Sequence, residues 1–206
     1  MGLLNFLELG NSGAIKRLEL RYFGDPVLRQ ACSPVTDIDS EVREFAAALT
    51  EAMHRYDGVG LAAPQVGVSR RIIAVDTRPP DRVLPPTAPP GERLLTPLMP
   101  VALIDPEILE VSETDEIGEE GCLSFPQIYG PVRRPSSVVF RARLVNGRVV
   151  EGACGGLLAR CLQHEIDHLN GVLFVDRIDE TERRPLQDEL RVLENETKRR
   201  LRQRQT

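Results

Sequence analysis

Residues 161–171 read "CLQHEIDHLNG", and this stretch predicts a metal-binding helix at the centre of the fold. His164 and His168 are four residues apart, so on a helix their imidazoles lie on one face and can reach the same ion. Glu165 lies about 100° around the helix axis, within reach of a water on that ion. The pattern H-E-x-x-H is typical of catalytic metal sites, which use three protein ligands and keep one position open. The alternative is a chance match in which hydrogen bonds satisfy both histidines.

The helix around this motif is expected to be buried on nearly all sides. It should run from about residue 156 to residue 170 and end at Gly171. The stripe opposite the histidines is apolar and consists of Leu158, Leu162, Ile166 and Leu169. A charged side chain such as Glu165 costs free energy in such a place, so its presence favours a functional role.

The sequence must supply a third ligand from elsewhere, because the chain has three histidines and His54 lies far upstream. One candidate is Cys122 in "GEEGCLSFP" (118–126), since one thiolate and two imidazoles form an open four-coordinate site. A single cysteine is more often a small buried hydrophobic residue, which is how we interpret Cys32 and Cys154. Cys161 lies one turn before His164 and could line a pocket, but as a ligand it would crowd the histidines.

A glycine-rich segment, "GVGLAAPQVG" (58–67), matches the letters of the dinucleotide-binding pattern G-x-G-x-x-A. That pattern requires a strand before it and a helix after it. Here a helix precedes the segment and Pro64 closes it, so we expect no nucleotide cofactor. The segment is instead expected to let the backbone approach a ligand closely and to present the Gln65 side chain as a neutral donor. The alternative is a plain turn.

The remaining pattern indicates an α+β fold of short, mainly antiparallel strands around the buried motif helix. A helix is expected over about 40–56, capped by Asp37 or Asp39. Strands are expected at 71–76 and 101–108, and a hairpin at 138–152 with a type I′ turn at Asn146-Gly147.

Two further segments stand out between and after these elements. Residues 77–100 contain eight of the chain's sixteen prolines, which predicts a surface insertion without regular structure. Residues 181–204 are polar and charge-rich with a helical pattern, and Pro185 is tolerable only in the first turns. The chain thus ends in a predicted helix followed by a basic tail.

The composition indicates one ordinary domain over residues 1–206, with 41% apolar and 28% charged residues. No apolar run approaches the roughly 20 residues that span a bilayer, so we expect no membrane contact. The net charge of −5 argues against binding nucleic acid through the whole domain. The first residues do not have the pattern of a signal peptide, so the four cysteines favour a reducing compartment, the bacterial cytoplasm.

Three segments, "GVGLAAPQ", "EGCLSFP" and "QHEIDHLNG", resemble in order and nearly letter for letter the three signature motifs of the peptide deformylases. The resemblance runs from residue 21 to about residue 176. It leaves residues 1–20 as an N-terminal extension, 77–100 as a proline-rich insertion and 181–206 as a C-terminal helix and tail. The stretch "QIYGPVRRP" (127–135) is similar to plant-organelle-type members, because Tyr129 stands where many members have a basic residue.

The resemblance implies a divalent metal, usually Fe²⁺ and replaceable by Zn²⁺, Ni²⁺ or Co²⁺, held by Cys122, His164 and His168. It implies hydrolysis of the N-formyl group from the initiator methionine of new polypeptides, with release of formate. Glu165 would act as general base and then acid on the attacking water. The Gln65 side chain and the Leu123 backbone N–H would stabilise the oxyanion.

The resemblance also implies a substrate pocket and a supporting ion pair. The expected substrate-binding residues are Val59, Gly60, Glu120, Gly121, Leu157 and Cys161. Residues 58–60 would leave room for a formyl hydrogen only, and the peptide would pair as an added strand near Gly60 and Gly121. Asp167 is expected to pair with Arg134, and the alternative is a solvated helix charge.

The expected partners are N-formylmethionyl nascent peptides and, through the basic tail "KRRLRQRQT" (198–206), the ribosome. The alternative for the tail is a solvated helix end, because cations suit a helix C-terminus. Two other functions compete for the motif. A zincin-type peptidase would need a third ligand downstream of the helix, and a structural metal site would need a fourth ligand such as Cys161.

Overall fold

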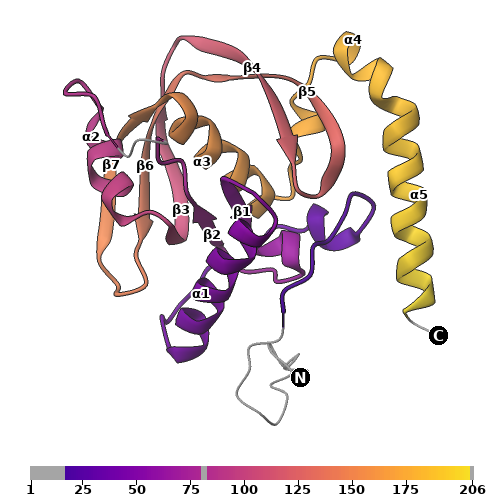
Figure 1. The fold of residues 1–206 in the computed structure, drawn as a ribbon, viewed down its shortest axis with the longest axis horizontal. Helices are drawn as coiled ribbons and strands as arrows, with labels where there is room; N and C mark the ends of the chain where they lie inside the picture. The colour runs from indigo at the N-terminus through magenta and orange to yellow at the C-terminus, as the bar shows by residue number, and fades with distance from the viewer. Residues whose placement is uncertain (1–16, 80–82, 205–206) are drawn as a thin grey trace.

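The computed structural model describes residues 17–79 and 83–204, and it confirms the α+β class (Figure 1). A five-stranded antiparallel sheet has the strand order β1-β2-β3-β6-β7, and a separate two-stranded sheet pairs β4 with β5. The strands of the first sheet are β1 Gly60–Ala62, β2 Ile72–Val75, β3 Val101–Val111, β6 Ser137–Arg143 and β7 Val149–Gly155. Those of the second are β4 Asp115–Cys122 and β5 Phe125–Pro135.

Helix α3 lies between the five-stranded sheet and the β4–β5 hairpin, and the other helices lie further out (Figure 1). The helices are α1 Ser40–Arg55, α2 Pro90–Leu95, α3 Gly156–Leu169, α4 Glu180–Arg183 and α5 Gln187–Gln203. Among the described residues, 3-10 turns occupy Pro26–Arg29, Ala63–Val66, Thr96–Leu98, Phe174–Asp176 and Arg184–Leu186. None of the helices in the described ranges is long and apolar enough to span a bilayer.

The five-stranded sheet is covered on both faces, which explains why all four residues of β2 are buried. Ile73 and Val75 pack in a core cluster with residues of α3, whereas Ile72 and Ala74 pack in another with residues of α1. Successive side chains of a strand point to opposite faces, so α1 and α3 lie on opposite sides of the sheet. This arrangement buries α3 in the middle of the molecule.

The two main helices begin and end where the sequence predicts. The Asp39 side chain accepts a hydrogen bond from the Val42 backbone N–H at 2.9 Å and caps α1. Gly171 follows α3 in the left-handed conformation, with φ +73°, which glycine adopts without strain. The expectation that α3 is buried on nearly all sides is confirmed, and Leu157 is an exception, 56% exposed because it faces an open cavity.

The proline-rich segment 77–100 is more ordered than predicted. It contains α2 and the 3-10 turn Thr96–Leu98, because its prolines stand at the first positions of helices, where a missing N–H costs no hydrogen bond. Leu95 is fully buried, and Gly91 packs against the backbone of β7. The segment therefore covers part of the sheet instead of lying wholly on the surface. Residues 80–82 lie outside the described residues.

Two other predicted details differ. The β6–β7 hairpin forms, but at its turn only Gly147 has a positive φ, whereas a type I′ turn needs two such residues. Gly147 N–H bonds the Leu144 carbonyl at 2.9 Å, so the connection is a type I turn followed by a left-handed glycine. Pro185 separates α4 from α5 through a 3-10 turn, so the C-terminal segment is not one helix.

Residues 23–28, which precede α1, join a third core cluster beneath the β4–β5 hairpin. Residues 1–16 of the expected extension lie outside the described residues. Leu18 is buried against α1, so the domain begins before residue 21. Phe23 stacks on Phe125 at 4.9 Å, and Phe125 meets Phe174 edge-on at 5.0 Å. This aromatic cluster supports the end of the hairpin that carries Cys122.

Candidate metal centre

Three side chains with metal-binding atoms converge between the hairpin and α3. The donor atoms of Cys122, His164 and His168 all lie within 4.8 Å of one another. Cys122 Sγ is 3.2 Å from His168 Nε2, and the two imidazole rings are 5.0 Å apart in an edge-on arrangement. Cys122 ends β4, where the chain turns back into β5, and the histidines occupy successive turns of α3. The structure thus brings together residues 42 and 46 positions apart in the sequence.

The donor set fits a divalent ion. One sulfur and two imidazole nitrogens suit Zn²⁺ or Fe²⁺ and leave one position of a tetrahedron open. His164 Nδ1 lies 2.9 Å from Glu120 Oε2, and an ionised carboxylate can only accept, so Nδ1 carries the hydrogen. The other ring nitrogen, Nε2, is therefore the atom that would coordinate an ion, with Glu120 fixing the orientation of the ring.

Glu165 is 4% exposed beside these donors. Its Oε2 has no hydrogen-bond partner among residues 17–79 and 83–204. Burial raises the pKa of the Glu165 carboxyl to about 7, although the nearby His164 opposes this. A buried carboxyl group without a partner can accept a proton and return it at neutral pH.

Gln65 presents its amide nitrogen to the same point. Its Oε1 accepts a hydrogen bond from the Ala62 backbone N–H at 2.7 Å, which fixes the orientation of the amide. Its Nε2 then lies 3.3 Å from Cys122 Sγ and 3.3 Å from Ser124 Oγ. Leu123 occupies the turn between β4 and β5, half-buried next to Gly58. Both predicted oxyanion donors therefore belong to segments that adjoin Cys122.

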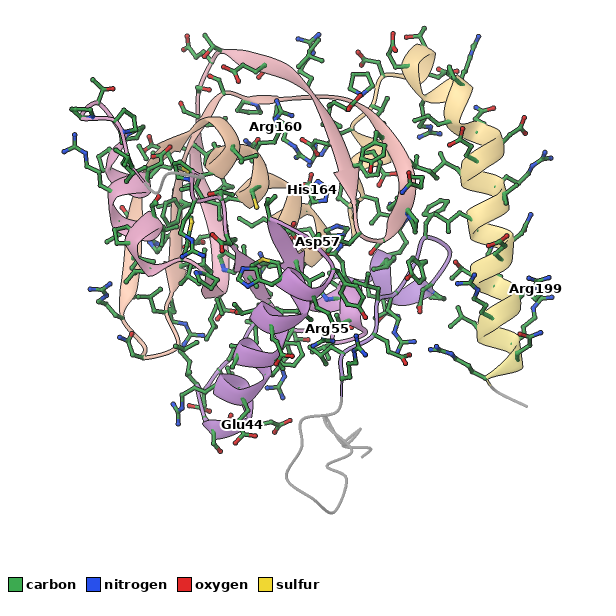
Figure 2. The ribbon with its side chains drawn as sticks, viewed as in Figure 1. Glu44, Arg55, Asp57, Arg160, His164 and Arg199 are labelled. Atoms are coloured by element: carbon green, nitrogen blue, oxygen red, sulfur yellow. The ribbon has the colours of Figure 1, made fainter. Side chains whose placement is uncertain are left out.

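A cavity of about 600 Å³ is lined by Cys122, His164 and Glu165. All six predicted pocket residues line it, namely Val59, Gly60, Glu120, Gly121, Leu157 and Cys161. Figure 2 shows Arg160 and His164 in the middle of the molecule, with Asp57 also at the cavity. Burial raises the pKa of the Cys161 thiol well above its usual value, and its Sγ lies 3.5 Å from the Val59 carbonyl oxygen. The wall it contributes is therefore neutral.

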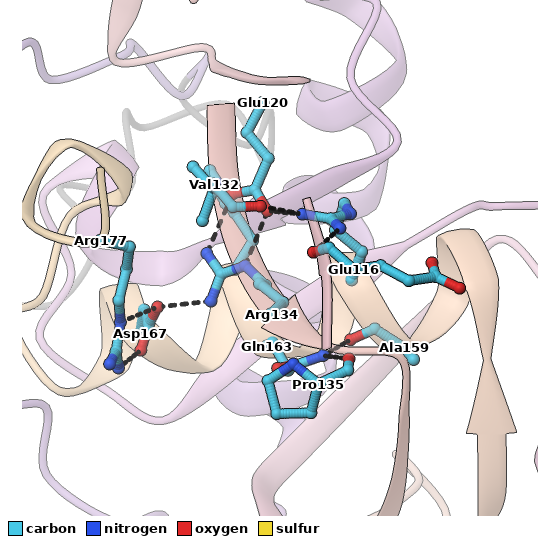
Figure 3. Close-up of polar contacts among 11 residues, drawn as sticks. Glu116, Glu120, Val132, Arg134, Pro135, Ala159, Gln163, Asp167 and Arg177 are labelled. Carbon is cyan, nitrogen blue, oxygen red and sulfur yellow. Dashed lines mark hydrogen bonds and ion pairs between the residues drawn. The ribbon is translucent and has the colours of Figure 1, made fainter. Parts of the chain in front are cut away.

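The carboxylate of Glu120 is buried in an ion network (Figure 3). Arg134 donates to its two oxygens at 2.7 and 2.9 Å and to Asp167 Oδ2 at 2.8 Å. Arg177 donates to Asp167 Oδ1 at 2.7 Å. Burial alone would raise the pKa of Glu120, but the hydrogen bonds from His164 and Arg134 hold it far below its usual range. Glu120 therefore stays ionised and continues to accept from His164.

The comparisons with known proteins agree with this geometry. A family model described as polypeptide deformylase matches residues 17–184. Peptide deformylase 2 of Gloeobacter violaceus is 46% identical over 162 residues, which cover 79% of this chain and 79% of that protein. The peptide deformylase of Thermotoga neapolitana is 46% identical over 164 residues, 80% of this chain and 88% of that protein.

The chain belongs to the peptide deformylase family. Two solved peptide deformylases share its fold. The crystal structure from Thermotoga maritima is 41% identical with a TM-score of 0.68, covering 80% of this chain and 99% of that one. A plant peptide deformylase is 32% identical with a TM-score of 0.76, and the match covers 89% of this chain and 92% of that one. Peptide deformylases are metal-dependent enzymes that remove the N-formyl group from nascent peptides, and this chain is a hydrolase of that family.

The family match begins four residues before the segment in which the sequence resemblance starts, and it extends to residue 184 instead of about 176. Sequence reasoning also missed two residues near the peptide deformylase site. Arg177 pairs with Asp167, and Arg160 donates to Glu120 at 2.8 Å. Arg160 could have been found, because it lies four residues before His164 and three after Leu157, on the helix face that meets the cavity.

Proposed function

We propose that this enzyme hydrolyses the N-formyl group of the initiator methionine on nascent polypeptides and releases formate. The observation that carries the proposal is the convergence of one sulfur and two ring nitrogens beside a buried carboxyl group whose Oε2 has no hydrogen-bond partner in the described part of the chain. Cys122, His164 and His168 would hold one divalent ion, Fe²⁺ in the cell and Zn²⁺, Ni²⁺ or Co²⁺ as substitutes. When bound, such an ion would lower the pKa of a water and polarise the formyl oxygen.

The chain's own residues would move the proton and hold the charge. Glu165 takes a proton from the attacking water and returns it to the amine nitrogen as the C–N bond breaks. Gln65 Nε2, whose orientation is fixed through Ala62, donates to the oxygen that becomes negative. The Leu123 backbone N–H would be the second donor, because it adjoins Cys122 at the turn.

The shape of the cavity would select formyl over larger acyl groups. A methyl group at Gly60 would lie 2.3 Å from Glu165 Oε1, so backbone and carboxyl group approach as closely as packing allows. The apolar side chains of Val59, Leu157 and Cys161 would receive the methionine side chain. β1 is an edge strand at the cavity, so the peptide backbone would pair beside Gly60, with contacts also near Gly121.

The decisive experiment combines metal analysis of anaerobically purified protein with formate release from formyl-Met-Ala-Ser. Glu165→Ala should keep one metal per chain and lose turnover by at least about 10²-fold. Glu189→Ala, an exposed carboxylate on α5, is the matched control and should behave as wild type. Cys122→Ala should lose the metal. A Glu165→Ala enzyme with wild-type turnover would contradict the role given to this residue.

The two competing functions of the metal-binding helix, a structural metal site and a zincin-type peptidase, predict different ligands and substrates. A structural site would need Cys161 as a fourth ligand, yet the group of donor atoms found among the described residues comprises Cys122, His164 and His168. Cys161→Ser should therefore keep the metal. A zincin-type peptidase would cleave an unformylated peptide and fail on a formylated one, so the same assay separates it from a deformylase.

Ribosome docking through residues 198–206 stays a prediction. Lys198, Arg200 and Arg204 form ion pairs with Glu194, Glu196 and Glu19, so part of the basic charge is already neutralised. Figure 2 shows Arg199 on the outer side of α5. Deleting 198–206 should reduce co-sedimentation with ribosomes at low salt, and unchanged binding would refute the idea. We also propose a cytoplasmic location, because all four cysteines are free and the relatives described above include bacterial proteins.

A further inference from the structure

The hairpin that carries Cys122 is not part of the main sheet. Within residues 17–79 and 83–204, neither β4 nor β5 is hydrogen-bonded to a strand of the five-stranded sheet. Backbone hydrogen bonds from Ser112 N–H to the Ser137 carbonyl and from Ser136 N–H to the Thr114 carbonyl, both 2.9 Å, join only the base of the hairpin to the end of the β3–β6 pair. His164 and His168 belong to α3, so side-chain contacts between the hairpin and α3 help to set the distance between the sulfur and the two ring nitrogens.

Arg160 makes several of these contacts from α3. Its Nη1 donates to Glu120 Oε1 at 2.8 Å and to the Val132 carbonyl oxygen at 3.1 Å. Its Nη2 donates to the Glu116 carbonyl oxygen at 3.0 Å. Glu116 and Glu120 belong to β4 and Val132 to β5, so one guanidinium group holds both strands.

The contacts to main-chain oxygens distinguish Arg160 from Arg134. Arg134 links two carboxylates, Glu120 and Asp167, whose side chains can change rotamer. A strand carbonyl cannot move without the strand, so a donor bound to one fixes the backbone itself. The Arg160 side chain is 18% exposed, which shields these bonds from competing water.

The hairpin is shaped to accept this guanidinium. A Cβ atom at Gly118, on β4, would lie 3.0 Å from Cζ and Nη2 of Arg160, closer than ordinary van der Waals contact. Glycine therefore allows the planar group to lie directly against the strand. The same guanidinium holds Glu120, whose other oxygen accepts from His164 Nδ1 at 2.9 Å.

We propose that Arg160 is a positioning residue that holds the β4–β5 hairpin against α3, so that Cys122 and His164 meet at metal-binding distance. The inference rests on the proposed metal site, and it adds a residue that has no contact with the ion. Because Arg160 acts on both Cys122, through the hairpin, and His164, through Glu120, its loss should weaken coordination without removing a ligand.

The test compares Arg160→Met and Arg160→Lys with the control Arg191→Met, an exposed arginine of α5. The readouts are the Co²⁺ dissociation constant, measured by chelator competition, the absorption spectrum of the Co²⁺ protein, and kcat and KM separately. Arg160→Met should weaken Co²⁺ binding about 10- to 100-fold and reduce the sulfur-to-cobalt absorption. Arg160→Lys should recover part of the affinity, and Arg191→Met should match wild type.

Two results would overturn the inference. One is an Arg160→Met protein with Co²⁺ affinity within twofold of wild type and an unchanged spectrum. The other is a rise in KM alone, which would make Arg160 a substrate contact. Failure of the wild-type protein to bind Co²⁺ would instead refute the metal site itself.

A second variant keeps the test decisive if Arg160→Met does not fold. Gly118→Ala leaves Arg160 in place but adds a methyl group against its guanidinium. It should weaken Co²⁺ binding several-fold. The matched control is Gly155→Ala, where the nearest atom to the new Cβ is 3.6 Å away. Equal Co²⁺ affinity in Gly118→Ala and Gly155→Ala would overturn the role of Arg160.

Discussion

Replacing Gly60 with alanine should disable the enzyme while leaving its metal ligands intact. The new Cβ would lie 2.3 Å from Glu165 Oε1 and 2.8 Å from Cys161 Sγ. The Glu165 carboxyl group must shift by about 1 Å to regain ordinary contact, and a misplacement of that size costs about 10²-fold in rate. We expect kcat to fall about 100-fold, and overpacking to lower the free energy of unfolding by about 1–3 kcal/mol.

The assay for Gly60→Ala is formate release at saturating substrate, with metal content and urea unfolding measured on the same preparation. Gly155→Ala is again the control, because its Cβ meets only ordinary contacts. The variant should contain as much metal as wild type, since none of the three ligands is among the nearest neighbours of the new methyl group. A kcat within twofold of wild type in a folded, metal-containing Gly60→Ala enzyme would refute the close approach of Gly60 and Glu165.

Three further predictions concern stability. Burial opposes ionisation of Asp176, but hydrogen bonds from Arg29 and the Leu173 N–H lower its pKa in the folded protein. The ionised Asp176 therefore stabilises the folded protein at pH values above about 3.9, the pKa of an unfolded aspartate, and this contribution is lost as the pH falls through the lower folded pKa. Asp176→Asn should therefore cost about 1 kcal/mol in urea unfolding at pH 7, a difference that disappears in acid. Gly171→Ala should lower the free energy of unfolding by about 3 kcal/mol, because the residue has a positive φ and its new Cβ would lie 2.6 Å from the Arg29 carbonyl oxygen. Gly147→Ala also has a positive φ but open space around the Cβ, so thermal unfolding should show a loss of only about 1 kcal/mol. Removing the metal with a chelator should lower the free energy of unfolding by about 2.7 kcal/mol, compared with protein in a free metal concentration of 100 times the Kd. Equal stability with and without metal would contradict the metal site.

Helices α1 and α3 and the proposed metal ligands were accessible from the sequence because their signals are local. Apolar spacing and the Asp39 cap located α1, and Gly171 located the end of α3. The three signature motifs supplied the metal ligands through the family resemblance. The helix α2 was missed because prolines suggest irregular structure, although a helix tolerates proline at its first positions. The turn at Asn146-Gly147 was misassigned because the same two residues also suit a three-residue loop.

The support of the site was less accessible, because it depends on contacts between distant segments. The Glu116 and Val132 carbonyl oxygens accept from Arg160, and a backbone carbonyl carries no sequence signature. The pairing of β4 with β5 was also missed, because "GEEGCLSFP" lacks the alternation of a half-buried strand. Only the Arg134–Asp167 pair was anticipated, through the family resemblance, and the structure joins these residues by a 2.8 Å hydrogen bond.

The two edges of the five-stranded sheet are protected in different ways. β7 lies at one edge, and α2 from the proline-rich segment packs on it. β1 lies at the other edge and is only three residues long. Exposed strand edges promote aggregation by templating the strands of other chains, and very short edges limit this. A three-residue β1 therefore offers few backbone groups for self-association into larger sheets, and on the proposed function it would still leave room for a single extended peptide.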